Sequence, residues 1–160
     1  NIPKNSFKVA DSQVASRWGN ICDFDNFDLI TPNEREARFS LADQDSTIGE
    51  LSKKLFEKTN CSNLILKLGF RGSLCVNKDK NNYQNGNSIP SFSKNVIDPV
   101  GAGDAYLAYA TLMMLETKNL LKSSIIGSIA AACECEKDGN EPITINLIEE
   151  KINIIKKSLI

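Results

Sequence analysis

Short apolar runs alternate with amphipathic stretches along the first half of the chain. The apolar runs, at 7–10, 28–30, 63–68 and 72–77, have the length of β-strands. Two Thr-x-x-Glu sequences, Thr31 to Glu34 and Thr47 to Glu50, have the spacing of a helix capping box. We therefore expect one helix to begin after Thr31, with Pro32 as its first residue, and another to begin after Thr47.

Long apolar stretches dominate the second half of the chain. Asn85-Gly86 favours a tight hairpin turn before 89–92, and the apolar residues 95–97 have the pattern of a strand end. Beyond them, the apolar spacing predicts three helices, over 105–115, 120–135 and 146–158.

The order of these elements indicates an α/β fold with a mainly parallel sheet and helices on both faces. In such sheets, ligands bind beyond the carboxyl ends of the strands. Three of the predicted strands end in polar or glycine-rich turns, after Ile30, after Leu68 and after Ile97. We expect these turns to converge on one site.

Composition narrows the classes of protein and of chemistry. The 160 residues suffice for a single domain with a sizeable core. The net charge of −1 gives no reason to expect a nucleic acid or an anionic membrane as partner, and no apolar run is long enough to span a bilayer. The five cysteines form no Cys-x-x-Cys pair, which favours reduced thiols in a cytoplasmic protein. The lack of histidine excludes Ser-His-Asp and Cys-His catalysis on this chain.

The run 98–104, Asp-Pro-Val-Gly-Ala-Gly-Asp, carries the strongest candidate chemistry. Gly101 and Gly103 lack a Cβ where the backbone must bend and a ligand must approach closely. The apolar stretch that follows places a helix N-terminus there, and the free N–H groups of a helix N-terminus bind anions. Asp104 would repel an anion, so a loop that only binds anions would not contain it. A loop that holds a phosphoryl group beside a base for a hydroxyl proton would contain such a residue.

Two other interpretations fit parts of this run. The glycines could serve only to turn the chain, with Asp104 as a helix cap. A dinucleotide-binding fingerprint is excluded, because Tyr106 stands where Gly-x-Gly-x-x-Gly requires its third glycine. The spacing of Asp98, the glycines and Asp104 before an apolar helix favours phosphoryl transfer.

These residues resemble the second signature of the ribokinase/PfkB family of carbohydrate kinases, Asp-Thr-x-Gly-Ala-Gly-Asp before a buried helix. Six positions fit that signature: Asp98, Gly101, Ala102, Gly103, Asp104 and Ala108. Tyr109 departs from it, because a small residue is usual there. The resemblance implies that Asp104 is the catalytic base and that Gly101–Gly103 stabilise the transferring phosphoryl group. It also places Asp98 where some family members hold a monovalent cation, although Asp98 could equally close the turn.

The run Asn33-Glu34-Arg35-Glu36 resembles the family's Asn-x-x-Glu element. Asn33 and Glu36 are three residues apart on a predicted helix, so their side chains face the same way. The resemblance implies that they hold Mg²⁺ through water. The alternative is a solvated first turn whose acidic residues favour the helix dipole, with Glu34 as the capping residue.

Two further segments resemble parts of the family's nucleotide site. The run 67–72, Lys-Leu-Gly-Phe-Arg-Gly, is similar to a Leu-Gly-x-x-Gly loop that packs around nucleotide phosphates. Gly69 and Gly72 would let the backbone approach closely and Lys67 would offset phosphate charge, whereas the alternative is an ordinary strand connection. Asn140 lies in the turn where the family builds its adenine pocket. The helix before that turn could equally be a core helix that ends at a glycine.

The resemblance runs from about Val9 to the C-terminus and covers only the later half of the family. We therefore expect one ribokinase-like α/β domain over 1–160, without the N-terminal sugar-binding part and the small β lid. Three segments look closest to the heptose 7-phosphate kinase branch, which serves nucleotide-heptose synthesis for lipopolysaccharide: 9–13, 31–37 and 139–142.

The function that the resemblance implies is ATP-dependent phosphoryl transfer to a hydroxyl of a sugar or sugar phosphate, with ATP and Mg²⁺ as cofactors. The alternative is a non-catalytic nucleotide-binding or assembly module derived from a truncated sugar kinase. A sugar or sugar phosphate is the expected substrate, and the expected protein partner is either a second copy of the chain or a missing N-terminal segment.

Overall fold

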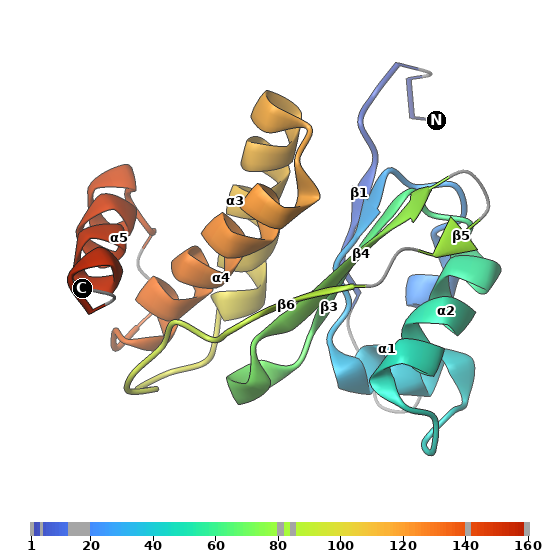
Figure 1. Cartoon of the computed structure of the whole chain (residues 1–160), viewed down its shortest axis with the longest axis horizontal. Helices are drawn as coiled ribbons and strands as arrows, with labels where there is room; N and C mark the ends of the chain where they lie inside the picture. The colour runs from blue at the N-terminus through green and yellow to red at the C-terminus, as the bar shows by residue number, and fades with distance from the viewer. Residues whose placement is uncertain are drawn as a thin grey trace. The chain divides into compact units, whose positions relative to one another are not determined.

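The computed structural model describes residues 2–3, 5–12, 20–79, 82–83, 86–139 and 142–158 (Figure 1). The chain forms two compact units. The first contains Asn1–Gly69 and Leu74–Ser88, and the second contains Phe70–Ser73 and Ile89–Ile160. The glycine-containing run 67–72 therefore passes from one unit to the other between its two glycines.

The first unit has an α/β arrangement. Its elements are β1 (Val9–Ala10), the 3₁₀ helix η1 (Ile21–Asp23), β2 (Leu29–Ile30), α1 (Glu34–Leu41), α2 (Ile48–Thr59), β3 (Asn63–Lys67), β4 (Ser73–Asp79), β5 (Asn82–Tyr83) and β6 (Asn87–Ile89). The strand order is β1-β2-β3-β4-β5, and β6 pairs with β4. One end residue of β4, Ser73, and one of β6, Ile89, belong to the second unit.

Strand direction places the polar turns of the first unit. β1, β2 and β3 are parallel, in the register Val9 with Leu29 and Leu29 with Asn63. Their carboxyl ends therefore lie at one edge of the sheet. β4 follows β3 after only the short 3₁₀ turn η2 (Gly69–Arg71), and this connection is too short for the crossover that a parallel pair requires. β5 is antiparallel to β4.

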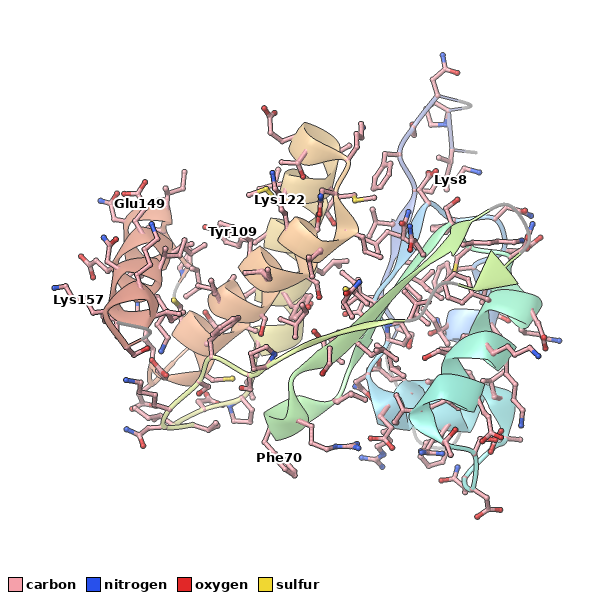
Figure 2. The ribbon with its side chains drawn as sticks, in the orientation of Figure 1. Lys8, Phe70, Tyr109, Lys122, Glu149 and Lys157 are labelled. Atoms are coloured by element: carbon pink, nitrogen blue, oxygen red, sulfur yellow. The ribbon has the colours of Figure 1, made fainter. Side chains whose placement is uncertain are left out.

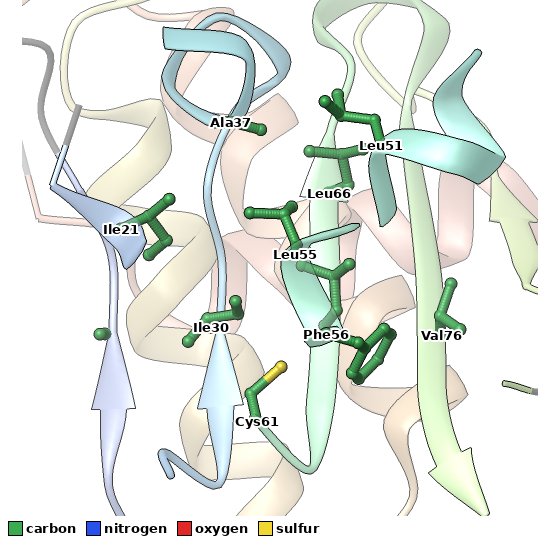
Figure 3. Close-up of a cluster of buried hydrophobic side chains, with 11 residues drawn as sticks. Ile21, Ile30, Ala37, Leu51, Leu55, Phe56, Cys61, Leu66 and Val76 are labelled. Atoms are coloured by element: carbon green, nitrogen blue, oxygen red, sulfur yellow. The ribbon is translucent and has the colours of Figure 1, made fainter. Parts of the chain in front are cut away.

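The core of the first unit lies between α1, α2 and the strands (Figure 3). Leu51, Leu55 and Phe56 recur at helical spacing in α2 and are almost fully buried. The predicted start of α2 is confirmed, because Thr47 and Glu50 form a reciprocal capping box. Apolar burial and a capped N-terminus thus agree on where this helix lies.

The second unit consists mainly of three helices, α3 (Ala102–Thr117), α4 (Leu120–Cys135) and α5 (Ile145–Ser158). α3 and α4 pack closely, because a Cβ on Gly127 would lie 2.6 Å from the Tyr106 ring. A second hydrophobic cluster joins α4 to α5 through four buried residues: Ile129, Ala130, Cys133 and Ile148. Within the described ranges, no helix has the length and apolar character needed to cross a membrane.

The α/β fold class and the predicted helices are confirmed, but the strand end predicted at 95–97 is wrong. Val96 and Ile97 are 62% and 61% exposed. The backbone N–H groups of Ile97 and Asp98 donate to the carbonyl of Cys135 at the end of α4, with N–O distances of 2.7 and 3.2 Å. The end of α4 thus accepts the hydrogen bonds of these two amides, which in a strand would go to a neighbouring strand. Asn85 of the predicted hairpin turn lies outside the described residues.

Candidate active site

The N-terminus of α1 is closed by its own side chains. Asn33 is the N-cap, and its Oδ1 accepts the Glu36 N–H at 2.9 Å. Glu36 Oε2 in turn accepts the Asn33 N–H at 2.7 Å, which completes a capping box. Both side chains that the sequence proposes for Mg²⁺ therefore also cap the helix.

The capping box predicted from Thr31 to Glu34 is wrong. The Pro32 carbonyl accepts the Lys67 N–H at 2.9 Å, so the chain continues to pair with β3 beyond Ile30 and turns into a helix only after Asn33. Among the described residues, the buried Thr31 hydroxyl has no hydrogen-bond partner. Glu34 instead forms an ion pair with Arg38 at 2.9 Å.

Three charged side chains gather beyond the carboxyl ends of the parallel strands. Asp11 follows β1, Glu36 lies in the first turn of α1, and Lys67 ends β3. Lys67 Nζ lies 2.6 Å from Asp11 Oδ2. Glu36 is only 7% exposed, and its burial raises the pKa of its carboxyl group, while the hydrogen bond from the Asn33 amide and the charge of Lys67 act against that rise.

The chemistry of Asn33 and Glu36 fits a hydrated Mg²⁺ ion better than a directly bound one. Asn33 Oδ1 and Glu36 Oε2 each already accept a backbone N–H. A carboxylate retains further lone pairs, above all on its second oxygen, and Mg²⁺ prefers to keep part of its water shell. Among the described residues, no group of three Cys, Asp or Glu side chains is placed to hold a metal ion.

The two glycines of the run 67–72 are explained by different features of the structure. Gly69 has a φ of +62°, and a Cβ there would meet nothing within 4 Å. Gly72 has a φ of +84°, and a Cβ there would lie 2.0 Å from the Ile89 carbonyl oxygen. Close passage of the chain at Ile89 thus explains Gly72, whereas Gly69 faces open space.

A cleft of about 520 Å³ lies beside Gly69 within the first unit. It is lined by residues of α1, of the turn after it and of the end of β3: Asn33, Glu34, Arg35, Arg38, Phe39, Gln44, Lys67, Leu68 and Gly69. Phe70, which follows Gly69 in the sequence and belongs to the second unit, is 91% exposed (Figure 2). The cleft is therefore lined by Asn33 of the Asn-x-x-Glu element and by the first glycine of the loop, but not by Glu36.

The N-terminus of α3, in the second unit, is open. Its N-cap is Gly101, with a φ of 83° and no side-chain capping bond. The Ala102 N–H donates back to the Pro99 carbonyl at 3.3 Å, but the N–H groups of Gly103 and Asp104 donate to no acceptor among the described residues. Asp104 is exposed in the first helical turn, and its carboxylate has no hydrogen bond or ion pair within the described parts of the chain.

Hydrogen bonds hold the loop that precedes this open N-terminus. Asp98 Oδ1 accepts the Val100 N–H at 2.9 Å, so Asp98 closes the turn, as one of the two interpretations predicts. Glu136, beyond α4, accepts the Lys94 N–H at 2.7 Å and holds Lys151 of α5 at 2.6 Å. These contacts fix the segment before Gly101 at both ends.

Comparison with known proteins identifies the family. The model of the pfkB family of carbohydrate kinases matches residues 4–145. This chain belongs to the pfkB family. Two curated relatives named bifunctional protein HldE are similar to it. The one from Nitratiruptor is 28% identical over 133 residues, covering 81% of this chain and 28% of that protein. The one from Helicobacter acinonychis is 32% identical over 115 residues, covering 70% and 24%.

Solved structures agree with this pfkB assignment and with the ribokinase-like fold. Ribokinase from Thermotoga maritima superposes with a TM-score of 0.68 and 26% identity, over 79% of this chain and 42% of that one. Phosphofructokinase-2 from Escherichia coli superposes with a TM-score of 0.75 and 16% identity, over 92% and 47%, and shows the fold alone. This pfkB chain thus spans less than half the length of these proteins.

The predicted site residues of this pfkB chain fall into two groups. Asn33, Glu36, Lys67 and Gly69 come together in the first unit. In the second unit, Asp98 and Gly101–Asp104 form the turn and first turn of α3, and Gly72 lies beside Ile89. Asn140 lies outside the described residues.

Sequence reasoning missed Asp11 and Glu136. Asp11 directly follows the first predicted strand, and this position was the available signal. No spacing rule points to Glu136, because its partner Lys151 is 15 residues away on another helix.

Proposed function

We propose that this pfkB-family chain carries the phosphoryl-transfer centre of an ATP-dependent kinase that acts on a hydroxyl of a sugar or sugar phosphate. The observation that carries this proposal is the N-terminus of α3, where two backbone N–H groups without partners among the described residues adjoin the exposed carboxylate of Asp104. Donors of this kind favour the negative charge of a transferring phosphoryl group. A carboxylate beside a bound phosphate has a chemical role if it takes a proton.

Each predicted residue has a role in this proposal. Asp104 accepts the proton of the acceptor hydroxyl. The amides of Gly101–Gly103 and of the following turn stabilise the charge on the phosphoryl group. Lys67, Gly69 and Gly72 hold the nucleotide, whose phosphates carry the charge that Lys67 offsets.

The cofactor roles follow the same chemistry. Asn33 and Glu36 would hold Mg²⁺ through water, and bound Mg²⁺ supplies neutralisation of phosphate charge. Asp98 has one carboxylate oxygen in the turn and a second one that suits a monovalent cation. We also keep Asn140 as a proposed nucleotide contact.

The acceptor proposed first is heptose 7-phosphate, because segments 9–13, 31–37 and 139–142 resemble kinases of that sugar. A cytoplasmic location follows from the same proposal, since ATP and sugar phosphates are found there. The proposed partners are a second copy of the chain or a segment that supplies the sugar contacts.

The test is ADP release from MgATP with a panel of sugars and sugar phosphates that includes heptose 7-phosphate. We expect turnover that depends on one class of acceptor and disappears in Asp104→Ala. Turnover that Asp104→Ala leaves unchanged would contradict the role of Asp104.

A second candidate is a non-catalytic nucleotide-binding or assembly module. It needs only the residues proposed to hold the nucleotide, Lys67, Gly69 and Gly72, and not the carboxylate of Asp104. This candidate predicts MgATP binding without ADP release for every acceptor in the panel. Calorimetric titration with MgATP, run beside the turnover assay, distinguishes the two functions.

A further inference from the structure

A cluster of three buried hydroxyl groups lies two residues beyond Asp104. Tyr106 of α3 is 5% exposed, and both Ser73 and Ser124 are fully buried. The Tyr106 Oη lies 2.9 Å from Ser73 Oγ and 2.7 Å from Ser124 Oγ, and it donates to the Ser124 carbonyl at 2.9 Å. All three residues belong to the second unit.

The Ser124 carbonyl can only accept, so the Tyr106 hydroxyl is the donor in that contact. A phenol has one proton to donate and two lone pairs to accept with. Because Tyr106 gives its proton to the Ser124 carbonyl, its lone pairs are left for the two serine hydroxyls. Removing the Tyr106 hydroxyl would take one contact from each buried serine and leave the two serines with only their mutual contact of 3.3 Å.

The cluster joins two segments to which the proposed function gives roles. Ser73 directly follows Gly72, the last glycine of the proposed nucleotide loop. Tyr106 lies on α3 just beyond Asp104, the proposed base. Ser124 anchors both of them to α4.

Packing alone does not call for the hydroxyl. The Tyr106 ring lies against Gly127, where a Cβ would approach it to 2.6 Å, and close to Ala110. A phenylalanine ring would fill the same space. The hydroxyl adds a direct link to Ser73 and thus to the end of the loop.

We propose that Tyr106 is a positioning residue, whose hydroxyl holds the Asp104 turn of α3 in fixed register with the Gly72–Ser73 end of the nucleotide loop. This inference rests on the proposed function. Its physical basis is that small displacements of a reacting group from its productive geometry are costly in rate.

Tyr106→Phe tests the link, and Tyr109→Phe is the matched control. Tyr109 lies on the same helix and also donates to a backbone carbonyl, that of Ile143 at 2.5 Å, but it does not take part in the hydroxyl cluster. We expect Tyr106→Phe to lower kcat about tenfold and Tyr109→Phe to change it less than twofold. Equal kcat values in the two variants would overturn the proposal.

A double-mutant cycle separates positioning from loss of stability. Ser73→Ala removes only the loop side of the link, so Tyr106→Phe and Ser73→Ala should be strongly non-additive in kcat. Additive losses would mean that each hydroxyl acts independently, which would overturn the proposal. Ser73→Ala also provides the test if Tyr106→Phe fails to fold.

Hydrogen exchange gives a readout that does not require turnover. In Tyr106→Phe, amides of 71–74 and the hydrogen-bonded amides of 105–106 should exchange faster together, while Tyr109→Phe should leave both segments unchanged. If the wild-type chain releases no ADP, the proposed function fails while this measurement still decides whether Tyr106 couples the two segments. Unchanged exchange in Tyr106→Phe would refute the coupling.

Discussion

α1 and α3 both begin with an acidic residue in the first turn, but the two helix starts differ in what satisfies them. At α1, the Asn33 side chain and the buried Glu36 carboxylate bond each other's backbone amides. At α3, Gly101 offers no side-chain cap, and Asp104 is exposed. The same local pattern, an acid three residues beyond the N-cap, thus gives a self-capped helix in one unit and an open one in the other.

This difference between the two helix starts indicates which of them is suited to bind an anionic ligand. The capping box at α1 has taken up the amide three residues beyond the N-cap, that of Glu36, whereas the corresponding amide of α3, that of Asp104, has no acceptor among the described residues. The open N-terminus also keeps its carboxylate free of protein partners among the described residues. We therefore place the phosphoryl chemistry at α3 and give α1 a supporting role.

Replacing Asp104 has the largest expected effect. Asp104→Asn should lower kcat by about 100- to 10,000-fold, because it removes the proposed base. The affinity for ATP should persist, because a negative charge near the phosphates is lost. The matched control is Glu116→Gln, an exposed acid near the other end of α3. Steady-state ADP release and calorimetry measure the two quantities, and a parallel loss of ATP binding would show that Asp104 is structural.

Replacing Gly101 should have the second largest effect. Its φ of 83° is one that only glycine adopts readily, so Gly101→Ala should lower the free energy of unfolding by about 1–2 kcal/mol. Chemical denaturation measures this change. An alanine variant as stable as the wild type would show that the backbone does not adopt this φ.

Replacing Asn33 tests the closed start of α1. Asn33→Ala should lower the free energy of unfolding by about 1 kcal/mol, because it removes the N-cap. Thr31→Val is the matched control: it should cost nothing, since the Thr31 hydroxyl is buried without a hydrogen-bond partner among the described residues. The reverse order of stabilities would restore Thr31 as the cap.

Replacing Glu36 should have the smallest effect at neutral pH. Burial raises the pKa of Glu36 in the folded chain, so its contribution to stability is full below the pKa of the unfolded chain and is lost as the pH rises through the folded pKa. Glutamine can still accept the Asn33 N–H but does not titrate.

Glu36→Gln should therefore be at least as stable as the wild type at pH 7 and should lose this part of the pH dependence. Denaturation curves from pH 4 to pH 8 check the sign of this difference in the free energy of unfolding between the variant and the wild type. A variant that loses stability at pH 7 but not at pH 4 would contradict it.

The sequence predicted best where the signal was local. α4 lies over the predicted residues because its apolar stretch and its polar N-cap are contiguous, and the glycine run does precede a helix. The start of α1 was wrongly placed, because the pairing of Pro32 with Lys67 of β3 is a long-range contact. Val96 and Ile97 have the composition of a strand, but their segment is tied to the end of α4.

The supporting contacts of the site were beyond sequence reasoning for the same reason. Ser73, Tyr106 and Ser124 are 33 and 18 residues apart along the chain, and none of them carries a recognisable spacing. Gly72 matched a loop motif, but its close approach to Ile89 became apparent only in three dimensions. Motifs thus predicted the proposed reacting groups, whereas the contacts around them came only from the fold.

The most direct test of the account is an NMR titration of ¹⁵N-labelled chain with MgATP that follows the backbone amides of Gly103 and Asp104. We predict that both amide signals shift and become protected from exchange as the nucleotide binds, because a phosphate accepts their hydrogen bonds. Binding of MgATP that leaves both amides unshifted and unprotected would contradict the claim that the open start of α3 is the phosphoryl site.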